Sequence, residues 1–132
     1  MFRVRVAFLT TFILILIAGG CTTNGKETKQ IGTKDAGKTI SLSVGDTIEV
    51  ALEGNPTTGY NWEAANLDTS ILKQVGDVAY TPESSAVGAP GQVVLRFEAV
   101  GSGETALQLI YHRSFETGVA PLQTFEVTVQ VD

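Results

Sequence analysis

The side chains that could act as nucleophiles or metal ligands are few in this chain of 132 residues. It contains one cysteine, Cys21, and one histidine, His112, far apart in the sequence. Ser114 lies two residues from His112, but no acidic residue is evident that would orient a Ser–His pair. One histidine and one cysteine do not make the usual zinc spacing, and no glycine-rich phosphate loop precedes a helix. The sequence therefore predicts no enzymatic activity, no metal site and no cofactor.

An uncharged stretch in the first half of the chain is better suited to recognition. It reads Asn55-Pro56-Thr57-Thr58-Gly59-Tyr60. Pro56 fixes its own φ and biases Asn55 towards an extended conformation, while Gly59 permits a positive φ. The side chains of Asn55 and the two threonines can hydrogen-bond to nearby backbone. We expect a stiff loop between two strands, displaying two small hydroxyl-bearing side chains; an ordinary turn is the alternative.

A second loop is predicted at residues 81–91. It contains two prolines, two serines and a single charge, Glu83, and it ends in Gly88, Ala89, Pro90 and Gly91. Loops of about 10 residues or more in a compact domain tend to be functional or disordered. We therefore count residues 88–91 among the candidate contacts.

A third loop is predicted at residues 112–122, where Arg113, Ser114 and Phe115 stand together. Arginine and aromatic side chains dominate the energetics of protein interfaces. Arg113 and Phe115 are therefore candidate contacts with a partner. The alternatives are a solvated Arg113 and a Phe115 buried in the core.

Alternating apolar residues mark the strands that must hold these loops. The alternation is clear at the ends of the domain and in its middle, and weaker elsewhere; the strands fall at residues 39–44, 47–52, 60–64, 72–75, 77–80, 93–98, 106–111 and 124–131. Such a pattern indicates strands with one buried face. Trp62 is expected in the core because its large apolar ring gains from burial.

The spacing of these strands predicts the fold class. Strands recur about every ten residues with turn signals between them, and no long segment has a helical period. This is typical of an all-β protein, and we predict an immunoglobulin-like β-sandwich of about seven or eight strands over residues 39–132. In that fold the loop after the second strand and the loop before the last share one end. Whether residues 88–91 reach the same end is left open.

The first twenty residues do not belong to this domain. Arg3 and Arg5 precede a nearly unbroken apolar run at residues 6–18, and small residues precede Cys21. This is the pattern of a secretory signal peptide, and the run is shorter than the roughly 20 residues of a membrane-spanning helix. The position of Cys21 resembles a bacterial lipobox, so we expect lipidation there. An uncleaved anchor and a free thiol left by nearby cleavage are the alternatives.

Residues 21–38 are polar and are predicted to form a flexible tether. Without the leader, seven Lys and Arg (nine minus two) face fourteen Asp and Glu, so the exported part carries a net charge of −7. This charge argues against binding nucleic acid or anionic lipid surfaces. We expect a monomer on the periplasmic or outer-surface face of a bacterial membrane, lipid-anchored through Cys21.

Three segments together resemble a known family. The stretch from Asn55 to Tyr60, followed by Asn61-Trp62, is similar to the signature loop of chagasin-type inhibitors of papain-like cysteine peptidases. Residues 88–91 stand where that family has a glycine-rich loop, and residues 111–116 stand where it has Tyr-x-Arg-Pro-Trp-Glu. Ser114 replaces the proline of that motif, which predicts a less rigid loop. Phe115 replaces its tryptophan, which keeps an aromatic side chain but removes the indole N–H donor.

The resemblance, which covers residues 39–131, implies a function. It implies reversible, non-covalent inhibition of a papain-family cysteine peptidase by three loops. The catalytic Cys and His of the target would lie under Thr57, Thr58 and Gly59. Compact, uncharged and stiff groups suit a concave cleft because little entropy is lost on binding. A non-inhibitory immunoglobulin-like module, binding another envelope protein or acting as a spacer, is the alternative.

Overall fold

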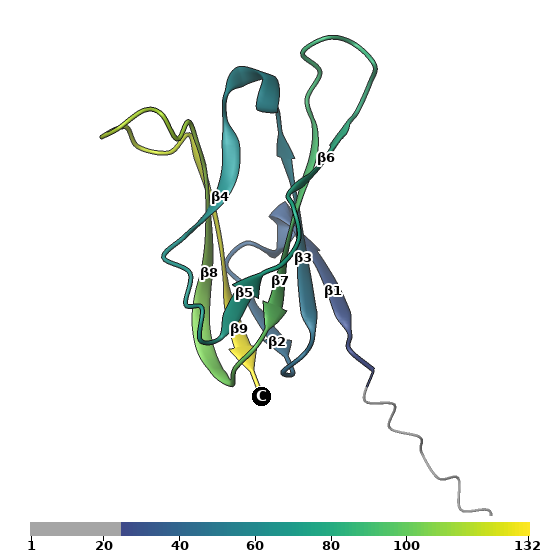
Figure 1. Ribbon diagram of the computed structural model, residues 1–132, viewed down its shortest axis with the longest axis vertical. Coiled ribbons are helices and arrows are strands. Elements are labelled where there is room, and N and C mark those ends of the chain that lie inside the picture. Colours follow the sequence, from purple (N-terminus) through teal and green to yellow (C-terminus); the bar gives the residue numbers. More distant parts are fainter. Residues whose placement is uncertain (1–24) are drawn as a thin grey trace, which may run out of the picture.

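The computed structural model describes residues 25–132, so the predicted signal peptide and Cys21 lie outside the described residues. Nine strands make up most of this part of the chain (Figure 1). The strands are β1 (Thr28–Gly32), β2 (Thr39–Leu42), β3 (Thr47–Gly54), β4 (Asn61–Ala65), β5 (Leu72–Gln74), β6 (Ala79–Pro82), β7 (Gly91–Ala99), β8 (Gly103–His112) and β9 (Gln123–Val131). Two short 3₁₀ turns are added, η1 (Thr33–Asp35) and η2 (Pro56–Thr58). Over these residues there is no helix with the length and apolar character needed to cross a bilayer.

The strands form two sheets that pack face to face as a sandwich. One sheet has the order β1-β3-β7-β5, with β6 also pairing with β7. The other has the order β2-β9-β8-β4. The longest pairings, β3 with β7 and β8 with β9, are antiparallel, and β1 and β2 join their sheets in parallel. The predicted all-β sandwich is confirmed, with nine strands instead of seven or eight.

The additional strand lies in the predicted tether. β1 pairs in parallel with β3, from Thr28 opposite Thr47 to Gly32 opposite Ala51. Ile31, the single aliphatic residue of residues 22–38, is buried at 8% exposure. The tether predicted over residues 21–38 is therefore wrong from Thr28 onward, and the domain begins before Thr39. The pattern was missed because one buried side chain in five residues gives no visible alternation.

The core lies between the sheets and follows the alternation in the sequence. In β7, every second residue from Gly91 to Ala99 is buried. In β9, Phe125, Val127 and Val129 are at most 3% exposed, and Trp62 on β4 is 6% exposed. The prediction that Trp62 lies in the core is confirmed. Two apolar inner faces exclude water from one another, which is the main stabilisation of a sandwich.

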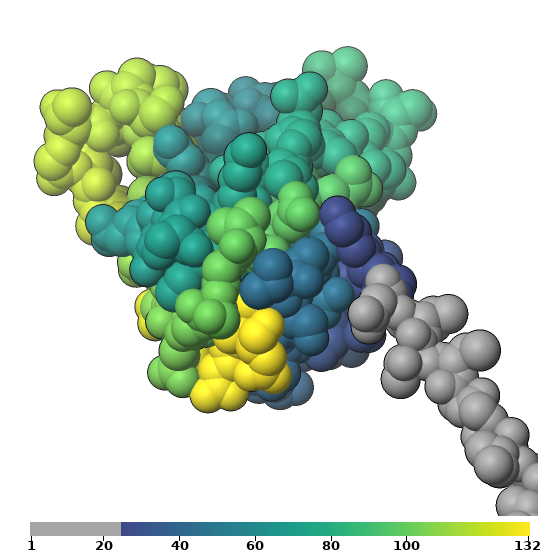
Figure 2. Space-filling model, turned by 60° about the horizontal axis from the view of Figure 1, so that its bottom comes forward, coloured from purple at the N-terminus to yellow at the C-terminus, as the bar shows by residue number. Residues whose placement is uncertain are grey.

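The connections between strands are divided between two poles. The η2 turn, the β6–β7 connection and the β8–β9 connection all extend from one pole (Figure 1). The opposite pole holds the carboxyl terminus and the entry into β1, which Figure 2 shows from that side. Lys26, Glu27 and Asp132 line one hollow there, together with the β2–β3 turn. The three loops singled out in the sequence are therefore grouped at one pole, away from both ends of the described chain.

Candidate functional site

The first loop, residues 55–60, is closed by its own side chains. Asn55 Oδ1 accepts hydrogen bonds from the backbone N–H of Thr57 at 3.2 Å and from its hydroxyl at 2.5 Å. The Thr58 hydroxyl donates to the carbonyl of Asn55 at 2.6 Å. Gly59 ends the η2 turn at a φ of 84°, which an L-residue rarely adopts. The predicted stiff loop therefore has a physical basis, and both threonine side chains are exposed.

Aromatic rings support this loop from below. The Tyr111 hydroxyl accepts a hydrogen bond from the backbone N–H of Asn55 at 2.8 Å. The Tyr111 ring lies 5.1 Å from Trp62 and 5.3 Å from Tyr60, centroid to centroid. Trp62 Nε1 donates to the carbonyl of Glu53, at the end of β3, at 2.9 Å. Tyr60 is half-buried beside the ring of Tyr111, so it supports the tip of the first loop and does not form part of it.

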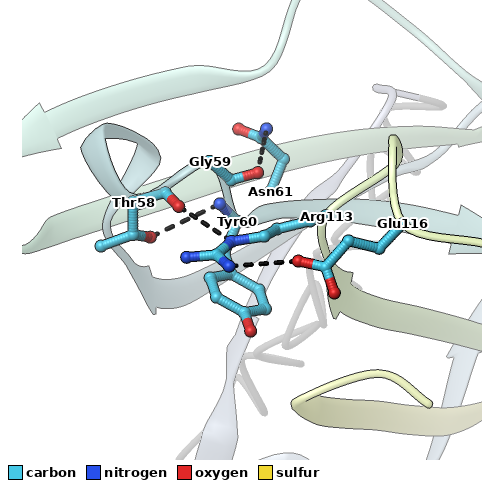
Figure 3. Close-up of polar contacts among 6 residues, drawn as sticks. All are labelled: Thr58, Gly59, Tyr60, Asn61, Arg113 and Glu116. Atoms are coloured by element: carbon cyan, nitrogen blue, oxygen red, sulfur yellow. Dashed lines mark hydrogen bonds and ion pairs between the residues drawn. The ribbon is translucent and has the colours of Figure 1, made fainter. Parts of the chain in front are cut away.

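Arg113 connects the third loop to the first (Figure 3). Its Nε donates to the carbonyl oxygen of Thr58 at 3.0 Å, and its Nη1 lies 3.1 Å from Glu116 Oε1. Its guanidinium carbon stands 4.4 Å from the centre of the Tyr60 ring, which is the geometry of a cation–π contact. The alternative of a solvated Arg113 is therefore wrong: the guanidinium is held in place between two loops.

Phe115 and Ser114 occupy the turn that follows Arg113. The backbone N–H of Glu116 closes this turn on the carbonyl of Arg113 at 3.1 Å. Phe115 is 72% exposed, so its burial in the core is excluded. A Cβ built on Gly59 would lie 3.4 Å from Cε1 of Phe115, so this ring leans on the side of the first loop. Ser114 is exposed on the same turn.

The second loop is also bonded to the first. The side-chain amide of Asn55 donates to the carbonyl of Gly88 at 2.9 Å, and the Tyr80 hydroxyl donates to the carbonyl of Ala89 at 2.7 Å. Gly91 is buried at the start of β7, where an added Cβ would lie 2.2 Å from the carbonyl of Thr81. Pro90 is exposed, and its carbonyl accepts from Glu83 N–H at 3.0 Å. Residues 88–91 thus form the base of the second loop and join it to the first.

Two residues outside the predicted site take part in its geometry. Tyr111 holds the first loop, and Glu116 holds the guanidinium of Arg113. The spacing of Glu116, three residues after Arg113, was a usable signal because a turn brings such a pair together. The contact between Tyr111 and Asn55 spans 56 residues, and nothing local in the sequence indicates it.

The three loops at this pole carry few charges. The first loop has no ionisable group apart from Tyr60, and the second has only Glu83. Arg113 is neutralised by Glu116. Within residues 25–132 no group of three or more His, Cys, Asp and Glu side chains is placed to hold a metal ion. The pole can therefore act as a rigid, largely neutral protuberance formed by three linked loops.

Comparison with known proteins identifies the family. Residues 41–129 match the sequence profile of the chagasin family peptidase inhibitors, I42. The chain belongs to the chagasin family of peptidase inhibitors. It is thus a cysteine protease inhibitor and not an enzyme, and a cysteine peptidase is its partner.

Individual relatives agree with this family assignment. Amoebiasin-2 of Entamoeba histolytica is 30% identical over 112 residues, which cover 84% of this chain and 91% of amoebiasin-2. Chagasin of Trypanosoma cruzi is 30% identical over 81 residues, 58% of this chain and 74% of chagasin. The crystal structure of the cysteine protease inhibitor EhICP2 from Entamoeba histolytica superposes with a TM-score of 0.71 at 26% identity, covering 81% of this chain and 97% of that one.

Proposed function

We propose that the three loops of this inhibitor enter the active-site cleft of a papain-like cysteine peptidase and block it reversibly, without a covalent bond. Thr57, Thr58 and Gly59 lie over the catalytic Cys and His of the peptidase. Arg113, Ser114 and Phe115 contact one flank of the cleft, and the second loop contacts the other. The observation that carries the proposal is the pair of hydrogen bonds, Asn55 to Gly88 and Arg113 to Thr58, that joins all three loops at one pole.

The closed form of the first loop explains how it can fill a cleft without being cut. The backbone N–H of Thr58 donates to the carbonyl of Asn55 at 3.1 Å, and that of Gly59 donates to Pro56 at 3.0 Å. A peptide substrate is commonly bound in an extended form, in which its backbone can pair with the enzyme. Residues 55–59 form a turn and cannot extend unless these bonds break. Their order before binding also reduces the entropy lost on association.

An inhibition assay tests this proposal. The domain of residues 25–132 is titrated against papain and, as a control, against a serine peptidase. We expect tight inhibition of papain alone, with activity recovered when the complex is diluted. Thr58→Trp is expected to weaken inhibition at least tenfold because the larger ring prevents close approach. Lack of inhibition at about micromolar inhibitor would contradict the proposal.

We also propose that the protein is exported and anchored to a bacterial membrane by lipid on Cys21. Two arginines, an apolar run and small residues before Cys21 support this proposal. Lys26 and Glu27 share a hollow with Asp132, at the pole opposite the three loops (Figure 1), so an anchor at residue 21 would leave the loops free. Mass spectrometry of the membrane fraction should detect an acylated Cys21 at the amino terminus. An unmodified chain beginning at Met1 would contradict the proposal.

A further inference from the structure

The apex of the second loop is an exposed aliphatic residue that the family motifs quoted above do not include. Val87 has a relative exposure of 105%, the highest among the exposed large apolar side chains of residues 25–132. Its neighbours Ser84, Ser85 and Ala86 are small and uncharged. Exposing a complete aliphatic side chain to water gives up the stabilisation that burial would provide. A protein surface that covers Val87 would recover it.

The backbone holds Val87 at this apex. The N–H of Ala89 donates to the carbonyl of Ala86 at 3.2 Å, and Gly88 has a φ of 78°. A bond from residue i+3 to residue i with a positive φ at i+2 is the signature of a type II turn. Val87 therefore occupies position i+1, at the corner of the turn. Gly88 is required for the turn itself, because an L-residue would be strained at this φ.

The base of the same loop is fixed to the rest of the pole. Bonds from Tyr80 to Ala89, from Asn55 to Gly88 and from Glu83 to Pro90 leave residues 84–87 as the part that extends beyond them. The loop rises beside the η2 turn in Figure 1. A fixed base means that Val87 is presented to a partner with little further loss of backbone entropy.

We propose that Val87 is the specificity-determining contact of the second loop and that it enters an apolar recess on the rim of the peptidase cleft. This inference rests on the proposed inhibitory function and deepens it. Residues 88–91 then act as the support of Val87. Cysteine peptidases with an apolar recess at this place are inhibited tightly, and those with a charged or filled one are inhibited weakly.

The test compares Val87→Ala, Val87→Asp and the parent domain against two papain-like peptidases whose cleft rims differ. We expect Val87→Ala to weaken inhibition of the better-matched enzyme about fivefold to tenfold, and Val87→Asp more than fiftyfold. The ratio of the two inhibition constants should shrink in both variants, because the discriminating contact is lost. Thermal melting should be unchanged, since Val87 packs on nothing in the domain.

Val44 supplies the matched control. It is a valine of 53% exposure in the β2–β3 turn, at the opposite pole. Val44→Ala should leave both inhibition constants within twofold of the parent. If the parent inhibits and Val87→Asp inhibits equally well, the role of Val87 is overturned while the inhibitory function stands. If the parent inhibits neither enzyme, both proposals fall.

Discussion

At the scale of single residues, the tip of the first loop depends on one glycine. Gly59 adopts a φ of 84°, and its α-carbon faces the ring of Phe115. The left-handed conformation costs an L-residue about 1–2 kcal/mol. A Cβ added at Gly59 would also lie 3.4 Å from the Phe115 ring, which is a tight contact. A side chain at this position would therefore disturb both the η2 turn and the packing of Phe115.

Gly59→Ala is therefore expected to weaken inhibition of papain about tenfold and to lower the melting temperature by several degrees. Gly37→Ala is the matched control, because Gly37 has a φ of 80° and nothing within 4 Å of an added Cβ. That variant carries a similar backbone cost at a position between η1 and β2, outside the three loops. It should lose similar stability and inhibit like the parent. Equal loss of inhibition in both variants would show that the effect is one of stability alone.

Arg113 is the residue that links two loops, so its removal should affect binding more than folding. Arg113→Met keeps much of the apolar stem but loses the bond to Thr58, the pair with Glu116 and the contact with Tyr60. We expect inhibition to weaken about tenfold or more, with little change in the melting temperature. Arg113→Lys should inhibit papain more strongly than Arg113→Met but less strongly than the parent, because an ammonium group cannot reproduce the fork of donors of a guanidinium.

Arg96 offers a control for loss of charge. Its Nε lies 3.3 Å from Glu49 Oε1, on the surface of the sheet that contains β3 and β7. Arg96→Met removes the same charge and should leave the inhibition constant unchanged. A matching loss in both variants would mean that net charge, and not the position of the guanidinium, controls inhibition.

At the scale of elements, β1 is held by a carboxylate that local sequence does not reveal. Asp46 is 9% exposed and accepts hydrogen bonds from the backbone N–H groups of Glu27 and Ser43, both at 2.9 Å. The bond from Glu27 has the larger effect, and together with the bond from Ser43 it holds the pKa of Asp46 below its ordinary value. One side chain thus ties the entry of β1 to the β2–β3 turn.

The direction of this shift sets the dependence of stability on pH. The pKa of Asp46 is lower in the folded chain than in the unfolded chain. The ionised carboxylate therefore stabilises the fold at pH values above its unfolded pKa, and this stabilisation is lost as the pH falls through its folded pKa. Asp46→Asn should melt at a lower temperature than the parent at neutral pH, and the difference in melting temperature should narrow as the pH falls below the ordinary pKa of an aspartate. Melting curves across this range measure it. The exposed Asp77→Asn is the control, and a gap that does not vary with pH would count against the prediction.

At the scale of the whole molecule, the sandwich separates the inhibitory pole from the ends of the described chain. Asp132 lines one hollow with Lys26 and Glu27, and Figure 1 shows the carboxyl terminus at the pole opposite the three loops. A large protein fused after Asp132 should therefore leave the inhibition constant within about twofold of the parent, as excluded volume at a remote end affects binding little. The same protein inserted between Ser84 and Ser85 should abolish inhibition. Equal inhibition by the two fusion proteins would contradict the proposal that only the pole with the three loops contacts the peptidase.

The features that depend on interactions between residues close in the sequence could be predicted from the sequence. Period-two alternation indicated the sandwich, because a strand with one face in water alternates polar and apolar residues. The large apolar ring of Trp62 indicated its burial. Pro56 and Gly59 indicated a stiff turn, because their backbone restrictions act locally. Thr57, Thr58 and Phe115 are exposed, so they remain accessible as the predicted contacts.

Only the tertiary structure decided which distant groups meet. The join between Asn55 and Gly88 spans 33 residues, and that between Arg113 and Thr58 spans 55. Such contacts depend on the register and order of strands in two sheets, which no local pattern encodes. The same reason explains why β1 was missed: a single buried Ile31 becomes a strand only beside β3. Sequence alone determined the turns and the buried faces, whereas the packing of the sheets decided that three turns form one surface.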